Sequence, residues 1–170
     1  MSEEEVAGWF VGRIPDGWFV APAGLQIDRD EILVIGELAA PQAIDELSDE
    51  ARQEALRSRV EAFREETRAA RIKIARSAES KFERKVSWGA SCGGQTFVFT
   101  HLAAPAMTRL RMRERRVLDT LIDAGVARSR SDALAWCVRM VGEHEDEWLA
   151  ELRDALAQVH EVRDRGPRSG

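Results

Sequence analysis

The sequence predicts an α+β fold with an N-terminal antiparallel β-meander, a long helix and a hairpin, followed by a basic ribbon, two helices and a C-terminal helix. Three observations lead to it. Stretches rich in aromatic and β-branched residues between residues 9 and 38 are separated by Pro- and Gly-containing turns, as is typical of strands. Residues 42–88 contain neither Gly nor Pro, which favours a long helix. A period of two over residues 107–113 changes to a helical period from Glu114.

The meander is expected over residues 9–38. Trp9–Arg13 and Trp18–Val20 flank the segment Ile14–Gly17, in which Pro presets a negative φ and Gly supplies a positive one. This pattern predicts a first hairpin. Two further strands are expected on either side of a polar turn, at residues 25–27 and 32–35.

The long helix is expected from Pro41 to Arg84. Its central residues recur at alternating steps of four and three, the spacing of a coiled-coil seam: Leu56, Val60, Phe63, Thr67, Ala70 and Ile74. Its second half is rich in Lys and Arg. These side chains provide either an additional phosphate-contacting surface or a solvated face with acid-base pairs at three- and four-residue spacing, and we favour the solvated face.

A second hairpin is expected from strands at Val86–Ala90 and Thr96–Thr100, placed to complete the N-terminal sheet. Cys92 and His101 are the only pair that suggests nucleophilic catalysis, and no acid stands at a recognisable spacing to orient them. The glycines have no phosphate-loop spacing, and the two cysteines have no paired metal spacing. We therefore predict no enzyme, no cofactor and no metal site.

Residues 106–142 carry the most specific pattern. Apolar or small residues alternate with three arginines: Thr108, Leu110 and Met112 with Arg109, Arg111 and Arg113. Such alternation predicts a short basic strand, preceded by a linker that ends at Pro105. A helix is expected from Glu114, with Gly125 ending it in a left-handed cap. Ser129 is expected to cap a second helix, with Asp132 reaching back to the N–H group of Ser129.

Strand, helix, capped turn and helix resemble the ribbon-helix-helix family of DNA-binding proteins. In that family two chains pair their strands, and the resulting ribbon enters the major groove with its outward side chains on base edges. The resemblance implies a homodimeric transcriptional regulator that binds double-stranded DNA. A phosphate would lie at the start of the second helix. Carried over to this sequence, the DNA-binding residues are Met107, Arg109, Arg111, Arg113, Ser129, Arg130 and Ser131.

Two other interpretations remain open for this segment. A module of the same shape can dimerise the chain or contact another protein without binding DNA. The segment can also be an ordinary part of an α+β core whose arginines are solvated. Exposure of Arg109 and Arg111 together would favour DNA binding, whereas a core role would bury or pair them.

The charge is strongly segregated around a net value of −5. Residues 106–142 hold 8 basic and 4 acidic side chains and residues 57–105 hold 10 and 5, whereas both ends of the chain are acidic. A basic middle is compatible with a local phosphate-facing surface. No apolar run approaches the roughly 20 residues needed to cross a bilayer, so we expect a cytoplasmic protein without a membrane partner.

The predicted organisation has three parts. An α+β domain covers residues 1–104, and the ribbon-helix-helix-like module with a C-terminal helix covers residues 105–165. Residues 166–170 form a tail. The C-terminal helix carries one apolar stripe: Trp148, Leu149, Leu152, Leu156 and Val159. The sequence leaves open the operator, any small-molecule effector and assembly beyond a dimer.

Overall fold

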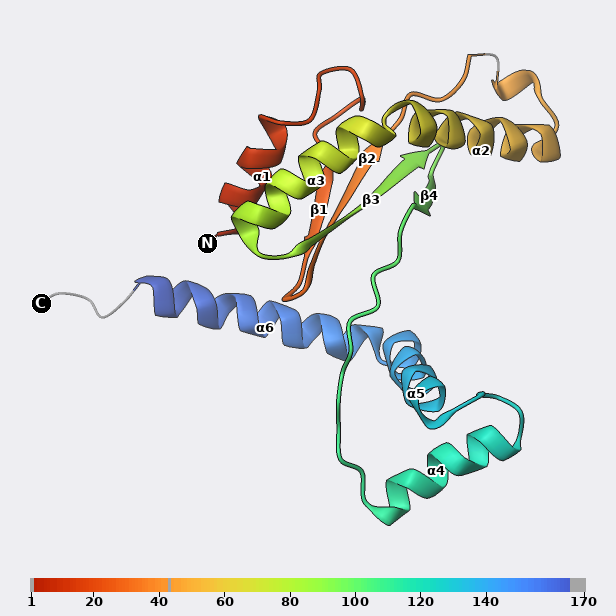
Figure 1. Ribbon diagram of the computed structural model, residues 1–170, viewed down its shortest axis with the longest axis vertical. Coiled ribbons are helices and arrows are strands. Elements are labelled where there is room, and N and C mark those ends of the chain that lie inside the picture. Colours follow the sequence, from red (N-terminus) through yellow and green to blue (C-terminus); the bar gives the residue numbers. More distant parts are fainter. Residues whose placement is uncertain (1, 43, 166–170) are drawn as a thin grey trace, which may run out of the picture. The chain divides into compact units, whose positions relative to one another are not determined.

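The computed structural model describes residues 2–42 and 44–165, so the expected tail at 166–170 lies outside the described residues. The chain divides into two compact units, Met1–Pro105 and Ala106–Gly170. The N-terminal unit holds a four-stranded sheet, and helices are found in both units (Figure 1). The α+β fold class is thereby confirmed.

The chain begins with a helix, α1 (Glu3–Val11), where the sequence led us to expect a strand. Ser2 and Glu5 form a reciprocal capping box, with the Ser2 hydroxyl 3.2 Å from the Glu5 backbone N and the Glu5 carboxylate 2.9 Å from the Ser2 backbone N. Val6 and Phe10, one turn apart, are buried. The strand expected at residues 9–13 is therefore wrong, because capping and helical burial outweigh the β-propensity of the aromatic residues. The strand expected at residues 18–20 is also wrong: these residues form a bend, from which the Val20 N–H donates to the Glu37 carbonyl at 2.9 Å.

The sheet consists of β1 (Gly24–Ile27), β2 (Glu31–Glu37), β3 (Lys85–Cys92) and β4 (Gln95–Val98), hydrogen-bonded in that order. The outer pairs β1–β2 and β3–β4 are antiparallel hairpins, as expected. The central pair β2–β3 is parallel. The sheet is thus mixed rather than a meander, because a parallel pair requires a helical crossover between its strands.

That crossover contains a 3₁₀ turn (Ile44–Glu46) and two helices, α2 (Asp49–Glu66) and α3 (Arg68–Phe82), instead of one long helix. The two helices meet at Thr67, whose hydroxyl donates a hydrogen bond of 2.6 Å to the Phe63 carbonyl. In the N-terminal unit α1, α2 and α3 lie on one face of the sheet (Figure 1). The residues of the expected coiled-coil seam are buried there except Ala70, which is half-buried: Val60 and Phe63 pack with Ala90 and Cys92 of β3.

The C-terminal unit contains α4 (Met112–Asp123), α5 (Arg130–His144) and α6 (Asp146–Arg165). Residues 100–111 belong to no helix or strand. Only three apolar residues of the described part of this unit are buried, namely Leu118, Ala127 and Ala133. Among the described residues of the whole chain, no helix combines the length and apolar character that a membrane span requires.

Candidate nucleic-acid interface

The segment expected to form the basic strand is solvent-exposed, and residues 107–111 belong to no helix or strand. Met107 is 99% exposed, and Arg109 and Arg111 are also exposed. Leu110 is half-buried and packs against the cluster around Leu118. A β-strand is defined by its backbone hydrogen bonds to a second strand. Residues 107–111 have no such partner and therefore do not form a strand. The alternation of the sequence is not reproduced in burial, because Thr108 and Met112 are exposed like the arginines and only Leu110 is half-buried.

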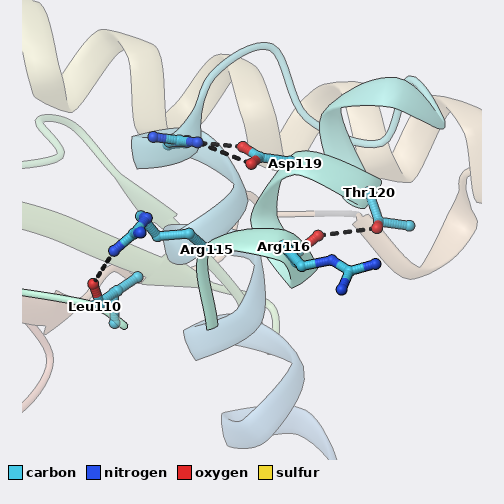
Figure 2. Close-up of polar contacts among 6 residues, drawn as sticks. Leu110, Arg115, Arg116, Asp119 and Thr120 are labelled. Atoms are coloured by element: carbon cyan, nitrogen blue, oxygen red, sulfur yellow. Dashed lines mark hydrogen bonds and ion pairs between the residues drawn. The ribbon is translucent and has the colours of Figure 1, made fainter. Parts of the chain in front are cut away.

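The helix α4 begins two residues earlier than expected. Arg111 is its N-cap residue, with φ −77° and ψ 173°, and Met112 and Arg113 lie in its first turn. The Arg115 guanidinium donates from Nη1 to the Leu110 carbonyl at 2.6 Å, which ties the helix to the preceding segment (Figure 2). Arg113 consequently does not continue the alternation of Arg109 and Arg111.

The turn between α4 and α5 has the geometry that the sequence predicts. Gly125 adopts φ +73°, a left-handed conformation that glycine accepts without strain. Its N–H donates to the Ile122 carbonyl, and the Val126 N–H donates to the Leu121 carbonyl, both at 2.9 Å. These two bonds form a Schellman motif, which fixes the direction in which the chain leaves α4.

Ser129 caps α5 as predicted, because its Oγ accepts a hydrogen bond from the Asp132 N–H at 3.2 Å. The Asp132 carboxylate, however, accepts from the Arg128 N–H at 3.0 Å rather than from that of Ser129. The second hydrogen bond of the expected capping box is thus made by the N–H group of Arg128, one residue before the N-cap. The backbone N–H groups of Arg130 and Ser131 belong to the first helical turn, which has no intrahelical acceptors.

The Arg130 side chain forms an ion pair with a carboxylate of α4, that of Asp119. Its Nε lies 2.7 Å from Asp119 Oδ1, and its Nη2 lies 2.8 Å from Oδ2 (Figure 2). This hydrogen bonding holds the pKa of Asp119 below its ordinary value. The guanidinium of Arg130 therefore joins the two helices. At the start of α5 the groups left for a phosphate are the backbone N–H donors and the exposed Ser131 side chain.

Sequence reasoning missed the roles of Arg115 and Asp119. Arg115 bonds a backbone carbonyl five residues earlier, and Asp119 pairs with a residue eleven positions later. Neither spacing is a helical one, and the Asp119–Arg130 pair exists only because the Schellman turn brings α5 alongside α4. No local pattern carries that information.

The other chemically suggestive groups lie in the N-terminal unit. Cys92 is fully buried, and this burial raises the pKa of its thiol, whereas His101 is exposed. The thiolate form of Cys92 is disfavoured accordingly. In the described part of the chain, no three His, Cys, Asp or Glu side chains come together in a way that would hold a metal ion.

Comparison with known proteins places both units in families. Residues 4–98 match the family described as "Rv1265-like protein, N-terminal domain". The chain belongs to the Rv1265-like family. Residues 111–163 match the "Mb1296 C-terminal domain". The two matched regions leave out residues 99–110, which include most of the exposed segment. Neither family is described as ribbon-helix-helix.

The relatives are mycobacterial. The chain is 53% identical over 163 residues to "Uncharacterized protein Rv1265" of Mycobacterium tuberculosis and equally to "Uncharacterized protein Mb1296" of Mycobacterium bovis. Each alignment covers 95% of this chain and 70% of the relative. No solved structure matches the chain significantly.

Proposed function

We propose that the protein is a homodimeric DNA-binding protein that regulates transcription and reads DNA through the segment from Met107 to Arg111. One observation carries the proposal: two exposed arginines flank Leu110 in a segment that leads directly into a helix, a Schellman turn and a capped second helix. Arginines reach guanine edges with two hydrogen bonds, and a two-stranded ribbon fits the major groove.

The phosphate contact is proposed at the start of α5. The N–H groups of Arg130 and Ser131 are donors without intrahelical acceptors, and the positive end of the helix dipole favours an anion there. The Arg130 guanidinium is assigned to holding α5 against α4, since both of its bonds go to Asp119. Arg113, in the first turn of α4, is assigned to a backbone phosphate rather than to a base.

The second chain is proposed from what the C-terminal unit leaves uncovered. Val117 and Val138 are 53% and 65% exposed, and Met112 is 69% exposed. A strand at Met107–Arg111 also needs a partner for its N–H and C=O groups. A second copy supplies both an identical strand and an identical apolar surface, which is what a two-fold interface requires.

No catalysis is assigned. Cysteine is the most nucleophilic residue type in the chain. Cys92 is buried, and this burial raises the pKa of its thiol. Cys137 packs against the cluster around Leu118. A regulator that acts on the genome of a bacterium works in the cytoplasm, and the proposal includes that location.

Selection of bound fragments from genomic DNA, followed by gel-shift titration, tests the proposal. Replacing Arg109 or Arg111 by Ala should cost about 1–3 kcal/mol and relax sequence preference, as expected for base contacts. Arg139→Ala is the matched control, because Arg139 is an exposed arginine on α5 outside the proposed interface. No selected sequence, or equal small losses from all three variants, would leave a dimerisation or protein-interaction module as the function.

A further inference from the structure

Arg71 on α3 is a buried cation without an acidic partner. The residue is only 8% exposed. Its Nε donates to Thr67 Oγ1 at 2.9 Å and its Nη2 donates to the Arg64 carbonyl at 2.6 Å. Among the described residues, none of the ion pairs involves Arg71, and its Nη1 forms no hydrogen bond although it retains access to solvent. A buried charge without a counter-charge lowers stability unless an anion compensates it.

Two further arginines add to the positive charge around Arg71. Burial lowers the pKa of Arg71, and the charges of Arg64 and Arg68 lower it further, so each of these two guanidinium groups repels that of Arg71. Arg64 and Arg68 are exposed and form no ion pair with any described residue. Residues 64–76 contain five basic and two acidic side chains. The balance of charge in the segment is therefore positive, and an anion would relieve the repulsion.

An aromatic ring fixes the position of two of these groups. The guanidinium carbon of Arg71 lies 4.8 Å from the ring centroid of Phe99, and that of Arg64 lies 5.8 Å from it. The Phe99 N–H donates to the Trp88 carbonyl at 2.8 Å, which anchors this residue to the sheet beyond β4. Because Thr67 and the Arg64 carbonyl also hold Arg71, the Arg71 guanidinium is preorganised.

We propose that Arg64, Arg68 and Arg71 form a binding site for a phosphate group at the junction of α2 and α3. The free Nη1 of Arg71 and the exposed guanidiniums of Arg64 and Arg68 are charge-assisted donors of the kind that phosphate oxygens accept. The phosphate belongs either to a small phosphorylated molecule or to a nucleic-acid backbone. This site lies in the N-terminal unit and does not depend on the proposed DNA-reading segment.

Calorimetric titration with inorganic pyrophosphate at constant ionic strength tests the site. The full chain carries Arg109→Ala and Arg111→Ala in every sample, so that failure of the DNA proposal does not affect the result. Saturable binding is expected, and Arg68→Gln should weaken it roughly tenfold. Arg68 is the residue to change because it is exposed and bonds nothing that the fold requires. Arg76→Gln, another exposed arginine of α3, is the control and should leave binding unchanged.

A second titration, with duplex DNA as the competitor of pyrophosphate, then identifies the source of the phosphate. If DNA displaces pyrophosphate from this chain and Arg68→Gln weakens the displacement, the site binds the nucleic-acid backbone. If DNA does not displace it, the site takes a small phosphorylated molecule. Absence of saturable binding, or equal loss from Arg68→Gln and Arg76→Gln, would overturn the proposal and leave Arg71 as a structural link between α2 and α3.

Discussion

Asp119 on α4 and Arg130 on α5 form a two-point ion pair, with Nε–Oδ1 and Nη2–Oδ2 distances of 2.7 and 2.8 Å. The pair is the only ion pair between α4 and α5 among the described residues. Both side chains keep about half of their surface in solvent, 56% for Arg130 and 42% for Asp119, so the pair is screened and contributes modestly. The contribution of the pair to stability is best detected by measuring unfolding as a function of pH.

The Asp119→Asn variant should be less stable than the natural chain only above the acidic range. Hydrogen bonding to Arg130 lowers the pKa of Asp119 from its ordinary 3.8, so the pair stabilises the folded state above that pH and loses its effect as the pH falls through the lowered pKa. Thermal melts from pH 2 to 7 should show a difference of a few degrees at neutral pH that vanishes in acid. Asp123→Asn, also exposed on α4, is the control. A difference that does not change with pH would contradict this assignment.

Gly125→Ala should destabilise the C-terminal unit. The left-handed φ of +73° costs an alanine about 1–2 kcal/mol. Gly142→Ala is the matched control, because Gly142 lies in α5, where an added Cβ meets no atom within 4 Å and should stabilise the helix by about 0.5–1 kcal/mol. Urea unfolding measures both. A Gly125→Ala variant as stable as the natural chain or more stable would show that the Schellman turn is not maintained in solution.

Gly36→Ala should disturb the N-terminal unit. A Cβ at this position of β2 would lie 2.3 Å from the Phe19 ring, which must then move at a cost of about 1–3 kcal/mol. Gly24→Ala is the control, since its nearest neighbour is a carbonyl oxygen at 3.7 Å. The loss should shrink when Gly36→Ala is combined with Phe19→Ala, as a double-mutant cycle would measure. Additive effects would mean that the two residues do not touch.

The unfolding midpoint should rise with protein concentration, because association and folding of a dimer are linked by mass action. Val138→Ser should weaken association, as this side chain is 65% exposed in one chain and belongs to the proposed dimer surface. Val20→Ser, at 58% exposure in the N-terminal unit, is the control and should change nothing. Sedimentation equilibrium measures the mass. A monomer at micromolar concentration would refute the dimer and, with it, two-fold DNA recognition.

Much of the turn chemistry was predictable from the sequence because its causes are local. The left-handed Gly125, the Ser129 cap and the β3–β4 hairpin each depend on residues within a few positions of one another. The α1 helix is an exception: its Ser2–Glu5 capping box is also local, but the consecutive apolar residues from Trp9 predict a strand.

The remaining differences come from contacts that no short pattern contains. The predicted long helix divides at Thr67, whose backbone departs from ideal helical values at φ −93° and ψ −1° and whose hydroxyl bonds back to the Phe63 carbonyl, a contact that bends helices. The parallel pairing of β2 with β3 joins residues about fifty positions apart. In the candidate interface, the exposure of Arg109 and Arg111 agrees with the prediction, while the ribbon depends on a second strand that a single chain cannot supply.

The exposed run from Thr100 to Arg109, without helix or strand, is the part of the chain most open to proteolysis. Trypsin cleaves after arginine, and Arg109 is exposed and precedes α4, so cleavage after Arg109 does not require the helix to unfold. Cutting there would separate the two compact units at the residues proposed to touch bases. Bound DNA would therefore protect the exposed peptide bonds of this segment from proteases. The lifetime of the intact protein would then depend on the fraction of time for which it is bound to DNA.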